Sequence, residues 1–196
     1  MHKLPFALIS VLLLAACVDT TGLTADSSRT PRGNANGAVI VQEFADIQCP
    51  ACKSAHAGIN KPLLDKYGNQ VRFEFMHFPL QSIHRFALEA AQAAECAADQ
   101  GKFWEFVDLA YERQTQLSST ALRDWAGVLG LDGELFDRCV RSEIKEDTVL
   151  EDYERGRALG VQGTPTYFVN GKRVESGFDT VSKVIDEALK GALQRL

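Results

Sequence analysis

The feature that most constrains the fold is a pair of cysteines, separated by two residues, where an apolar run changes to a helical pattern. Residues 39–44 (VIVQEF) are apolar and β-branched and are bounded by turn residues, which is typical of a buried strand. Cys49, Pro50, Ala51 and Cys52 follow, and Pro50 favours the first turn of a helix because a proline lacks the N–H that would have no partner there. The pattern predicts that both cysteines lie at a strand-to-helix junction.

The remaining patterns predict a mixed α/β domain. Alternating apolar and polar residues indicate further strands, apolar residues spaced by three and four indicate helices, and Asn170-Gly171 is typical of a tight hairpin turn. Pro62 predicts an interruption of the first helix. The predicted order is strand, helix, strand, helical block, strand, strand and helix, with strands near 39–44, 71–78, 166–169 and 172–174, the helical insertion at about 80–160, and the last helix over 181–193.

Two cysteines so spaced in the first turn of a helix lie on the same side, close enough to form a bond. The unpaired backbone N–H groups and the helix dipole favour negative charge on the outer sulfur. Because a thiolate is the attacking species in disulfide exchange, we predict that Cys49 is an accessible nucleophile. Cys52, one turn further in, would be the more buried sulfur that resolves a mixed disulfide.

Other interpretations of this pair remain open. A structural zinc site needs about four ligands, and His56, His77 and His84 are scattered along the chain. An inert bridge between residues so close would stabilise the fold little, because the loop that it closes is small. Two alternatives to an enzyme also remain: a metal-binding lipoprotein of the cell envelope and a purely structural one. We predict no metal and no other cofactor.

The first residues predict export. Lys3 is followed by an apolar run over residues 7–16 that is too short to span a bilayer comfortably. The sequence Leu-Ala-Ala-Cys that ends at Cys17 resembles the lipobox of bacterial lipoproteins, which implies a signal peptide over 1–16 and a lipid anchor on Cys17. A plain secretory peptide with Cys17 as a free thiol is the alternative. Residues 17–37 contain almost no large apolar side chains and predict a flexible tether.

Charge and the other cysteines narrow the setting further. The formal net charge is −5 and there is no basic cluster, which argues against a nucleic-acid partner. In an exported protein cysteines persist as disulfides, so Cys96 and Cys139, both on predicted helices of the insertion, are expected to form a structural disulfide. Two separately buried thiols are the alternative.

Two segments carry a resemblance to a known family. Residues 41–53, around the cysteine pair, and residues 161–171, which contain Gly-Thr-Pro-Thr, resemble the active-site and cis-proline segments of DsbA-like proteins of the thioredoxin superfamily. The similarity runs from about residue 38 to the C-terminus and includes 95–98 and 101–104 within the helical block. It implies one thioredoxin-like domain over 38–196 with a helical insertion between its second and third strands.

The resemblance implies roles for three further residues. Pro165 would follow a cis peptide bond and pack against the cysteine pair, and Thr164 would offer backbone groups to a substrate peptide; the alternative is a trans proline that opens a strand. Glu43 would be a buried acid that moves a proton to or from Cys52, whereas a surface glutamate on an edge strand is the other interpretation. Lys53 and His56 are expected to be solvated helical residues.

The resemblance also implies an activity and a location. The chain would introduce disulfides into protein thiol substrates on the periplasmic side of the cell envelope and would be reoxidised by a membrane quinone-coupled partner. A reductase or isomerase that uses the same residues is the alternative, because DsbA has Pro-His where this chain has Pro50 and Ala51. Val18 after the lipid cysteine favours the outer membrane.

Overall fold

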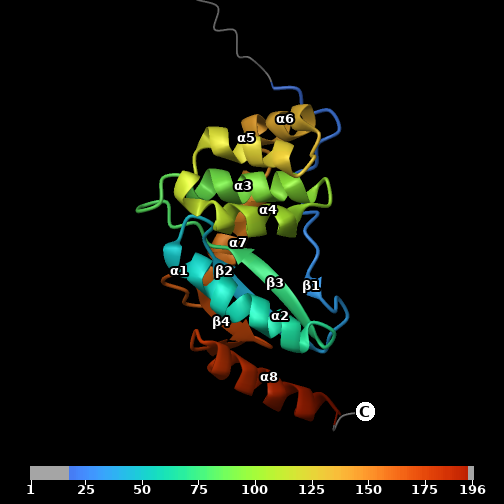
Figure 1. The fold of residues 1–196 in the computed structure, drawn as a ribbon, viewed down its shortest axis with the longest axis vertical. Coiled ribbons are helices and arrows are strands. Elements are labelled where there is room, and N and C mark those ends of the chain that lie inside the picture. Colours follow the sequence, from blue (N-terminus) through green and yellow to red (C-terminus); the bar gives the residue numbers. More distant parts are fainter. Residues whose placement is uncertain (1–17, 194–196) are drawn as a thin grey trace, which may run out of the picture.

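The apolar runs pair into a five-stranded mixed sheet in the computed structural model, which describes residues 18–193 (Figure 1). The strands lie in the order β1-β3-β2-β4-β5. β2 and β3 are parallel, whereas β1–β3, β2–β4 and β4–β5 are antiparallel. The strand bounds are β1 Arg32–Gly33, β2 Val39–Ala45, β3 Val71–His77, β4 Thr166–Val169 and β5 Lys172–Val174.

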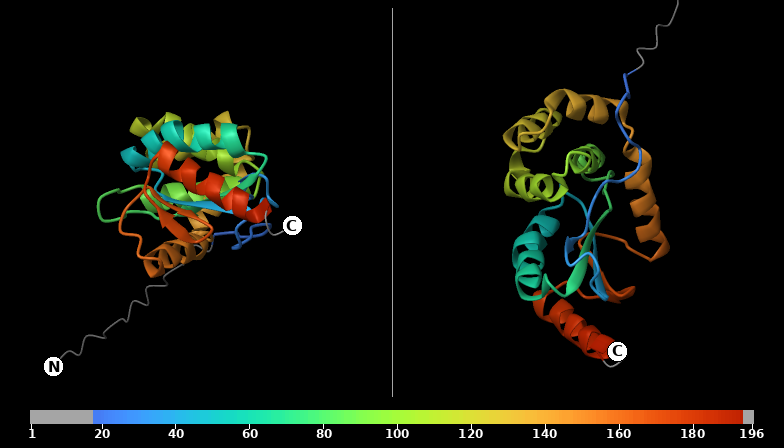
Figure 2. Two further views of the ribbon diagram at one scale, coloured as in Figure 1. Left: turned by 90° about the horizontal axis from the view of Figure 1, so that it is seen from below. Right: turned by 90° about the vertical axis from the view of Figure 1, so that its right-hand side faces the viewer.

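Helices cover both faces of the sheet and one end of it. The helical bounds are α1 Pro50–Ala55, η1 His56–Asn60, α2 Lys61–Tyr67, α3 Ala87–Ala98, α4 Phe103–Glu112, η2 Gln114–Gln116, α5 Ser119–Val128, α6 Gly133–Ser142, α7 Glu146–Ala158 and α8 Phe178–Leu193. The stretch from α3 to α7 lies between β3 and β4 in the chain, so the predicted α/β fold with a helical insertion is confirmed. Figure 2 shows α2 and α7 on opposite sides of the sheet and the rest of the insertion beyond its end.

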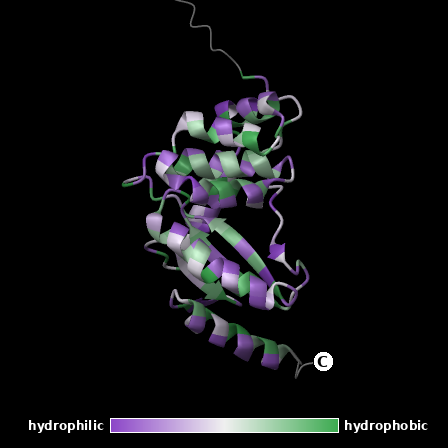
Figure 3. Ribbon diagram, in the orientation of Figure 1, coloured by the Kyte–Doolittle hydropathy of each residue, from purple (hydrophilic) through white to green (hydrophobic). Residues whose placement is uncertain are grey.

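The core follows the two-residue period of the strands. Val39 and Val41 of β2 pack with α2 and α8, and Phe44 faces the other way, toward Phe78 and the partly buried Tyr153 of α7. Figure 3 shows apolar residues gathered along the central strands and polar residues interleaved along α8. α7 approaches this face closely at Gly156, where an added Cβ would lie 2.7 Å from the Phe78 ring and 2.9 Å from the Phe44 ring.

The helix that begins after Cys49 is continuous but irregular. Between α1 and α2 lies a π-helical segment, η1, in which the backbone N–H of Lys61 donates to the carbonyl oxygen of His56. Pro62 follows at the start of α2 and has no N–H to continue the ladder. The predicted interruption is therefore a widened turn, and this turn places the Asn60 side chain in the buried core.

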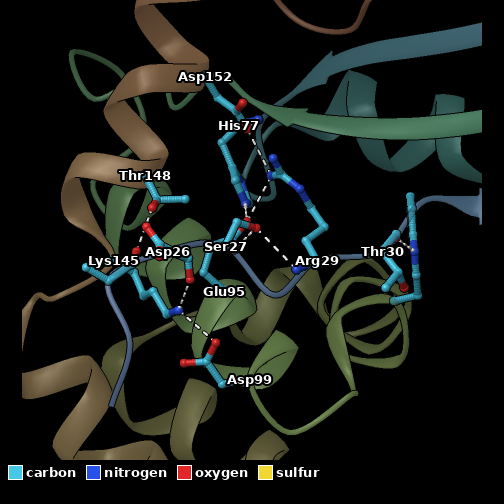
Figure 4. Close-up of polar contacts among 12 residues, drawn as sticks. Asp26, Ser27, Arg29, Thr30, His77, Glu95, Asp99, Lys145, Thr148 and Asp152 are labelled. Carbon is cyan, nitrogen blue, oxygen red and sulfur yellow. Dashed lines mark hydrogen bonds and ion pairs between the residues drawn. The ribbon is translucent and has the colours of Figure 1, made fainter.

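The segment that was expected to be a flexible tether is attached to the domain in its described part. Ser27 Oγ donates to Glu95 Oε2 at 2.7 Å, and Arg29 Nη1 lies 2.9 Å from both Glu95 Oε1 and Asp152 Oδ2 (Figure 4). The side chain of Glu95 is wholly buried. That tether prediction was wrong for this segment, because polar residues that cannot form a core of their own can still pair with buried charges on the helices beside them.

A buried lysine fastens the same segment at a second point. Lys145 Nζ, with a fully buried side chain, donates to the carbonyl oxygen of Asp26 at 2.6 Å and to Asp99 Oδ1 at 2.7 Å (Figure 4). Further along, Trp104 Nε1 donates to the Thr30 carbonyl oxygen, and β1 then adds an edge strand to β3. We call residues 19–33 the N-terminal strap.

The predicted signal peptide and Cys17 lie outside the described residues. Within residues 18–193, no helix combines the length and the apolar character needed to cross a membrane.

Candidate active site

Cys49 and Cys52 lie at the start of the helix that follows β2. Cys49 is the N-cap residue of α1, in an extended conformation with φ −72° and ψ 121°, and Pro50 occupies the first helical turn. Cys52 is fully buried, whereas Cys49 retains an exposed fraction of 6%. Cys49 is thus the outer sulfur, as predicted, but it is more enclosed than the sequence suggested.

The surroundings of Cys49 favour a thiolate. A hydrogen bond from the Cys52 thiol is the largest influence; with contacts to Thr164 and to the backbone N–H groups of Cys52 and Ala51, it outweighs partial burial and lowers the pKa of Cys49 to about 5. At neutral pH this sulfur is therefore charged in the reduced protein.

The second sulfur has the opposite environment. Burial, the hydrogen bond to Cys49 and the nearby charge of Glu43 raise the pKa of Cys52 well above its ordinary value. The backbone N–H of Asp46 donates to Cys52 Sγ at 3.5 Å, the one polar contact from the preceding loop to this sulfur. Cys52 is thus a protonated thiol that must lose its proton before it can attack.

The Thr164–Pro165 peptide bond is cis and lies across from the cysteine pair. Cys49 Sγ is 3.5 Å from the carbonyl oxygen of Thr164. The turn before β4 therefore brings Thr164 and Pro165 to the sulfurs, although they lie more than a hundred positions after the cysteines in the sequence. A pocket lies beside the cis proline, lined by Pro165, Thr166, Arg173, Val174, Glu175 and Ser176.

Glu43 is buried near both cysteines rather than on the surface. It is fully buried on the central strand β2, so the interpretation as an exposed edge residue is excluded. Asn60 Nδ2 donates to Glu43 Oε2 at 2.8 Å, and the Tyr167 hydroxyl lies 3.0 Å from Glu43 Oε1. Burial raises the pKa of Glu43 to about 7, although the hydrogen bonds from Asn60 and Tyr167 oppose this rise. Its carboxyl can therefore gain or lose a proton near neutral pH.

The loop before Cys49 is held by residues that sequence reasoning missed. Asp46 is buried, and its carboxylate accepts hydrogen bonds from the backbone N–H groups of Gln48 and Leu80, with His84 Nδ1 2.7 Å away. Gln114 Nε2 donates to the carbonyl oxygen of Cys49 at 3.0 Å. An acid three residues before the cysteine was the available signal for Asp46. Gln114 gave none, because it comes from η2 in the insertion.

His56 differs from the expectation of a solvated residue. Its ring is buried and lies 4.9 Å from that of Tyr111, measured between centroids. Its Nε2 is 3.0 Å from Asp108 Oδ1, which is an ion-pair distance without the alignment of a hydrogen bond. Lys53 is half-buried, and its Nζ donates to the carbonyl oxygen of Glu112 at 3.3 Å. Both residues therefore join the active-site helix to α4.

The other two described cysteines form a disulfide. Cys96 of α3 and Cys139 of α6 are bonded, with their Cα atoms 5.9 Å apart. Both are buried within the helical insertion. Among residues 18–193, no three His, Cys, Asp or Glu side chains gather closely enough to share a metal ion.

Comparison with known proteins gives this geometry a family. The sequence matches the thioredoxin family over residues 25–187, a match that begins within the strap. It is 37% identical to the Na(+)/H(+) antiporter NhaA 3 of Salinispora tropica over 142 residues, which are 72% of this chain and 22% of the antiporter. The NhaA 1 antiporter of Salinispora arenicola is 34% identical over 166 residues, 84% of this chain and 25% of that protein. The chain spans about a quarter of the length of these relatives.

Solved structures share the thioredoxin-like fold over most of this chain. A thioredoxin-like oxidoreductase from Silicibacter pomeroyi has a TM-score of 0.69 and 28% identity, covering 86% of this chain and 94% of that one. Oxidised BdbD from Bacillus subtilis has a TM-score of 0.71 and 24% identity, with 84% and 99% coverage. The alpha-DsbA1 protein of Wolbachia pipientis has a TM-score of 0.71 and 21% identity, with 84% and 92% coverage.

Proposed function

The chain belongs to the thioredoxin family, and from that premise we propose that it is a DsbA-like thiol–disulfide oxidoreductase whose reacting sulfurs are Cys49 and Cys52. One observation carries the proposal: an outer sulfur with a pKa lowered to about 5 lies beside a buried, protonated one. Such an asymmetric pair defines which sulfur attacks and leaves as a thiolate and which one resolves.

The proposed reaction begins with the Cys49–Cys52 disulfide. A substrate thiolate attacks Cys49 Sγ, so that a mixed disulfide forms while Cys52 leaves and takes up a proton. The second thiolate of the substrate then attacks the substrate sulfur of that mixed disulfide, and Cys49 leaves as a thiolate. The substrate loses two electrons and gains a disulfide, and the enzyme ends as a Cys49 thiolate and a Cys52 thiol.

The direction and setting belong to the same proposal. We assign the oxidising direction because the low pKa of Cys49 stabilises the reduced enzyme and so favours uptake of electrons from protein thiols. Protein thiols of the cell envelope would be the substrates, a quinone-coupled membrane protein would be the oxidant, and a lipid on Cys17 would hold the chain to the outer membrane. The alternative is a reductase or isomerase, which would start from the reduced Cys49 and Cys52 and use the same exchange steps in the opposite direction.

The first test is the alkylation of Cys49 in the reduced protein as a function of pH. With iodoacetamide and mass mapping of the modified cysteine, we expect a midpoint near pH 5. An ordinary thiol titrates at about pH 8.5, and a midpoint there would remove the source of the activity.

Two variants test the assignment of the sulfurs. Cys49→Ser should abolish insulin reduction and thiol oxidation, whereas Cys52→Ser should accumulate a mixed disulfide between Cys49 and a model peptide thiol. The redox potential of the wild-type pair then decides the direction. A value near the oxidising end of the family range, about −120 mV, supports the oxidase, and one near −270 mV supports the reductase.

A further inference from the structure

A closed ring of three buried side chains lies near the cysteine pair. Glu43 of β2, Asn60 of η1 and Tyr167 of β4 have exposed fractions of 0%, 1% and 0%. Asn60 Nδ2 donates to Glu43 Oε2 at 2.8 Å, and the Tyr167 hydroxyl lies 2.6 Å from Asn60 Oδ1 and 3.0 Å from Glu43 Oε1. Glu43 and Tyr167 are paired across neighbouring strands, so the backbone fixes two members of the ring.

The Tyr167 hydroxyl has one hydrogen but two oxygen neighbours in this ring. If Glu43 is protonated, its Oε1–H donates to the tyrosine oxygen, the tyrosine donates to Asn60 Oδ1, and Asn60 donates back to Glu43 Oε2. Every polar atom then has a partner, and all three hydrogen bonds run in the same direction around the ring. The protonated acid is therefore well accommodated despite its complete burial.

When Glu43 is ionised, the tyrosine hydrogen turns toward it. Tyr167 and Asn60 then each donate to one carboxylate oxygen, and these bonds to a charged acceptor are stronger than those to a neutral one. Only Asn60 Oδ1 loses its donor. When Glu43 gives up or takes up its proton, rotation of this one hydroxyl therefore adapts the hydrogen bonds to the new state without movement of the backbone.

We propose that Asn60 and Tyr167 are positioning residues that allow the buried Glu43 carboxyl both to release and to accept a proton during disulfide exchange. The inference rests on the proposed function and on the proton exchange between Glu43 and Cys52 that the family resemblance implies, and it adds roles for Asn60 and Tyr167. The other titratable groups that interact with Glu43 are Cys49, Cys52 of α1 and Tyr111 of α4.

The proton balance of each direction requires this property. When substrate attack on Cys49 breaks the Cys49–Cys52 bond, Cys52 leaves as a thiolate and takes the proton of the Glu43 acid. In the reverse step, the Cys52 thiol gives its proton to the Glu43 carboxylate and attacks Cys49, and the substrate leaves as a thiolate. A carboxyl locked in its acid form would serve the first step and hinder the second.

The test compares wild-type protein with Tyr167→Phe and Asn60→Leu. Each variant removes a donor to the carboxylate, so the ionised form loses more than the acid does. Infrared titration of the protonated carboxyl band, identified by its loss in Glu43→Gln, should show a midpoint raised by about one pH unit in both variants. Attack by Cys52 on a mixed disulfide should slow about fivefold at pH 7, because the ionised fraction of Glu43 falls.

Tyr67→Phe is the matched control. Tyr67 is also buried, and its hydroxyl donates to Asp186 Oδ1 at 2.8 Å, away from the ring. This variant should leave the carboxyl midpoint unchanged. Equal midpoints in wild-type protein and both ring variants would overturn the inference, whether or not exchange is observed.

The wild-type protein provides a test that needs no variant. In the reduced form at pH 5 it should show the band of a buried protonated carboxyl, and the band should disappear as the pH rises through about 7. A band that persists to pH 10 would show that Glu43 stays protonated, and it would overturn the inference that the ring accommodates both protonation states. The infrared result does not depend on turnover, so an active ring in a protein without exchange activity would contradict the proposed function alone.

Discussion

The molecule contains two cysteine pairs in contrasting surroundings. Cys49 and Cys52 belong to one short helical turn, where a hydrogen bond between the sulfurs and nearby backbone N–H groups lowers the pKa of the outer one. Cys96 and Cys139 are 43 residues apart in sequence and join α3 to α6 inside an apolar cluster. The comparison teaches that reactivity comes from what surrounds a sulfur, since both pairs are largely buried.

The N-terminal strap strengthens this contrast. Leu23 packs on the apolar cluster that contains both pairs, but the pocket over the Cys96–Cys139 disulfide is lined by the strap residues Gly22 and Thr24. No strap residue lines the pocket beside Pro165. The strap therefore lies over the structural disulfide and not over the pocket beside the cis proline.

The largest expected effect is on stability, from removal of the second pair. Replacing both Cys96 and Cys139 by Ala should lower the free energy of unfolding by about 4 kcal/mol, the chain-entropy value for a loop of this size. Denaturant unfolding measures the loss. Thiol exchange at Cys49 should persist in the folded fraction, and its disappearance would mean that the two pairs are not independent.

Selective reduction measures the same contrast in the intact protein. In low concentrations of dithiothreitol, the Cys49–Cys52 disulfide should be reduced on the order of a hundredfold faster than Cys96–Cys139, because Cys49 keeps an exposed fraction of 6%, whereas Cys96 and Cys139 have 1% and 2%. Timed alkylation and mass mapping follow both pairs. Equal rates would contradict the protection of Cys96–Cys139 by the strap.

Releasing the strap should reduce the difference between the pairs. Lys145→Met removes the buried ammonium that binds Asp26 and Asp99, and it should cost about 2 kcal/mol. Hydrogen exchange should increase in the strap, and reduction of Cys96–Cys139 should accelerate severalfold. The control is Lys102→Met, which breaks an exposed ion pair with Glu105 and should change little.

The smallest expected effect tests one contact of the reactive sulfur. Thr164→Val removes the hydroxyl that helps to lower the pKa of Cys49, so the alkylation midpoint should rise by about half a pH unit. Thr148→Val removes a hydroxyl that donates to the strap, far from the sulfur, and should leave the midpoint in place. A shift in both variants would point to a general effect of the substitution.

The shifted pKa values of Cys49 and Glu43 predict how the stability of the reduced protein depends on pH. Cys49 has a folded pKa below its unfolded value, so the unfolded reduced chain binds more protons between about pH 5 and 9 and stability rises with pH there. Glu43 has a raised folded pKa of about 7, so its contribution is complete below about pH 4.5 and is lost as the pH rises to 7. The two contributions oppose each other in the reduced protein.

Sequence reasoning was sufficient where local pattern and chemistry coincide. The Cys49–Cys52 spacing after a β-branched run, with Pro50 at the helix start, predicted the strand-to-helix junction found in the structure. It was insufficient for the strap and for His56, where polar residues pair with groups distant in sequence. Asn60 and Gln114 were missed for the same reason, since neither lies near a motif.

The sequence by itself determined the order of the elements and the presence of two sulfurs at a helix start, because these follow from hydrophobic period and local geometry. Only the tertiary structure decided how each ionisable group behaves. Burial and hydrogen-bond partners come from strands and helices that are far apart in the chain: Tyr167 reaches Glu43 across 124 positions, and Arg29 reaches Glu95 across 66. Electrostatic energies depend on those distances in space, which no local pattern encodes.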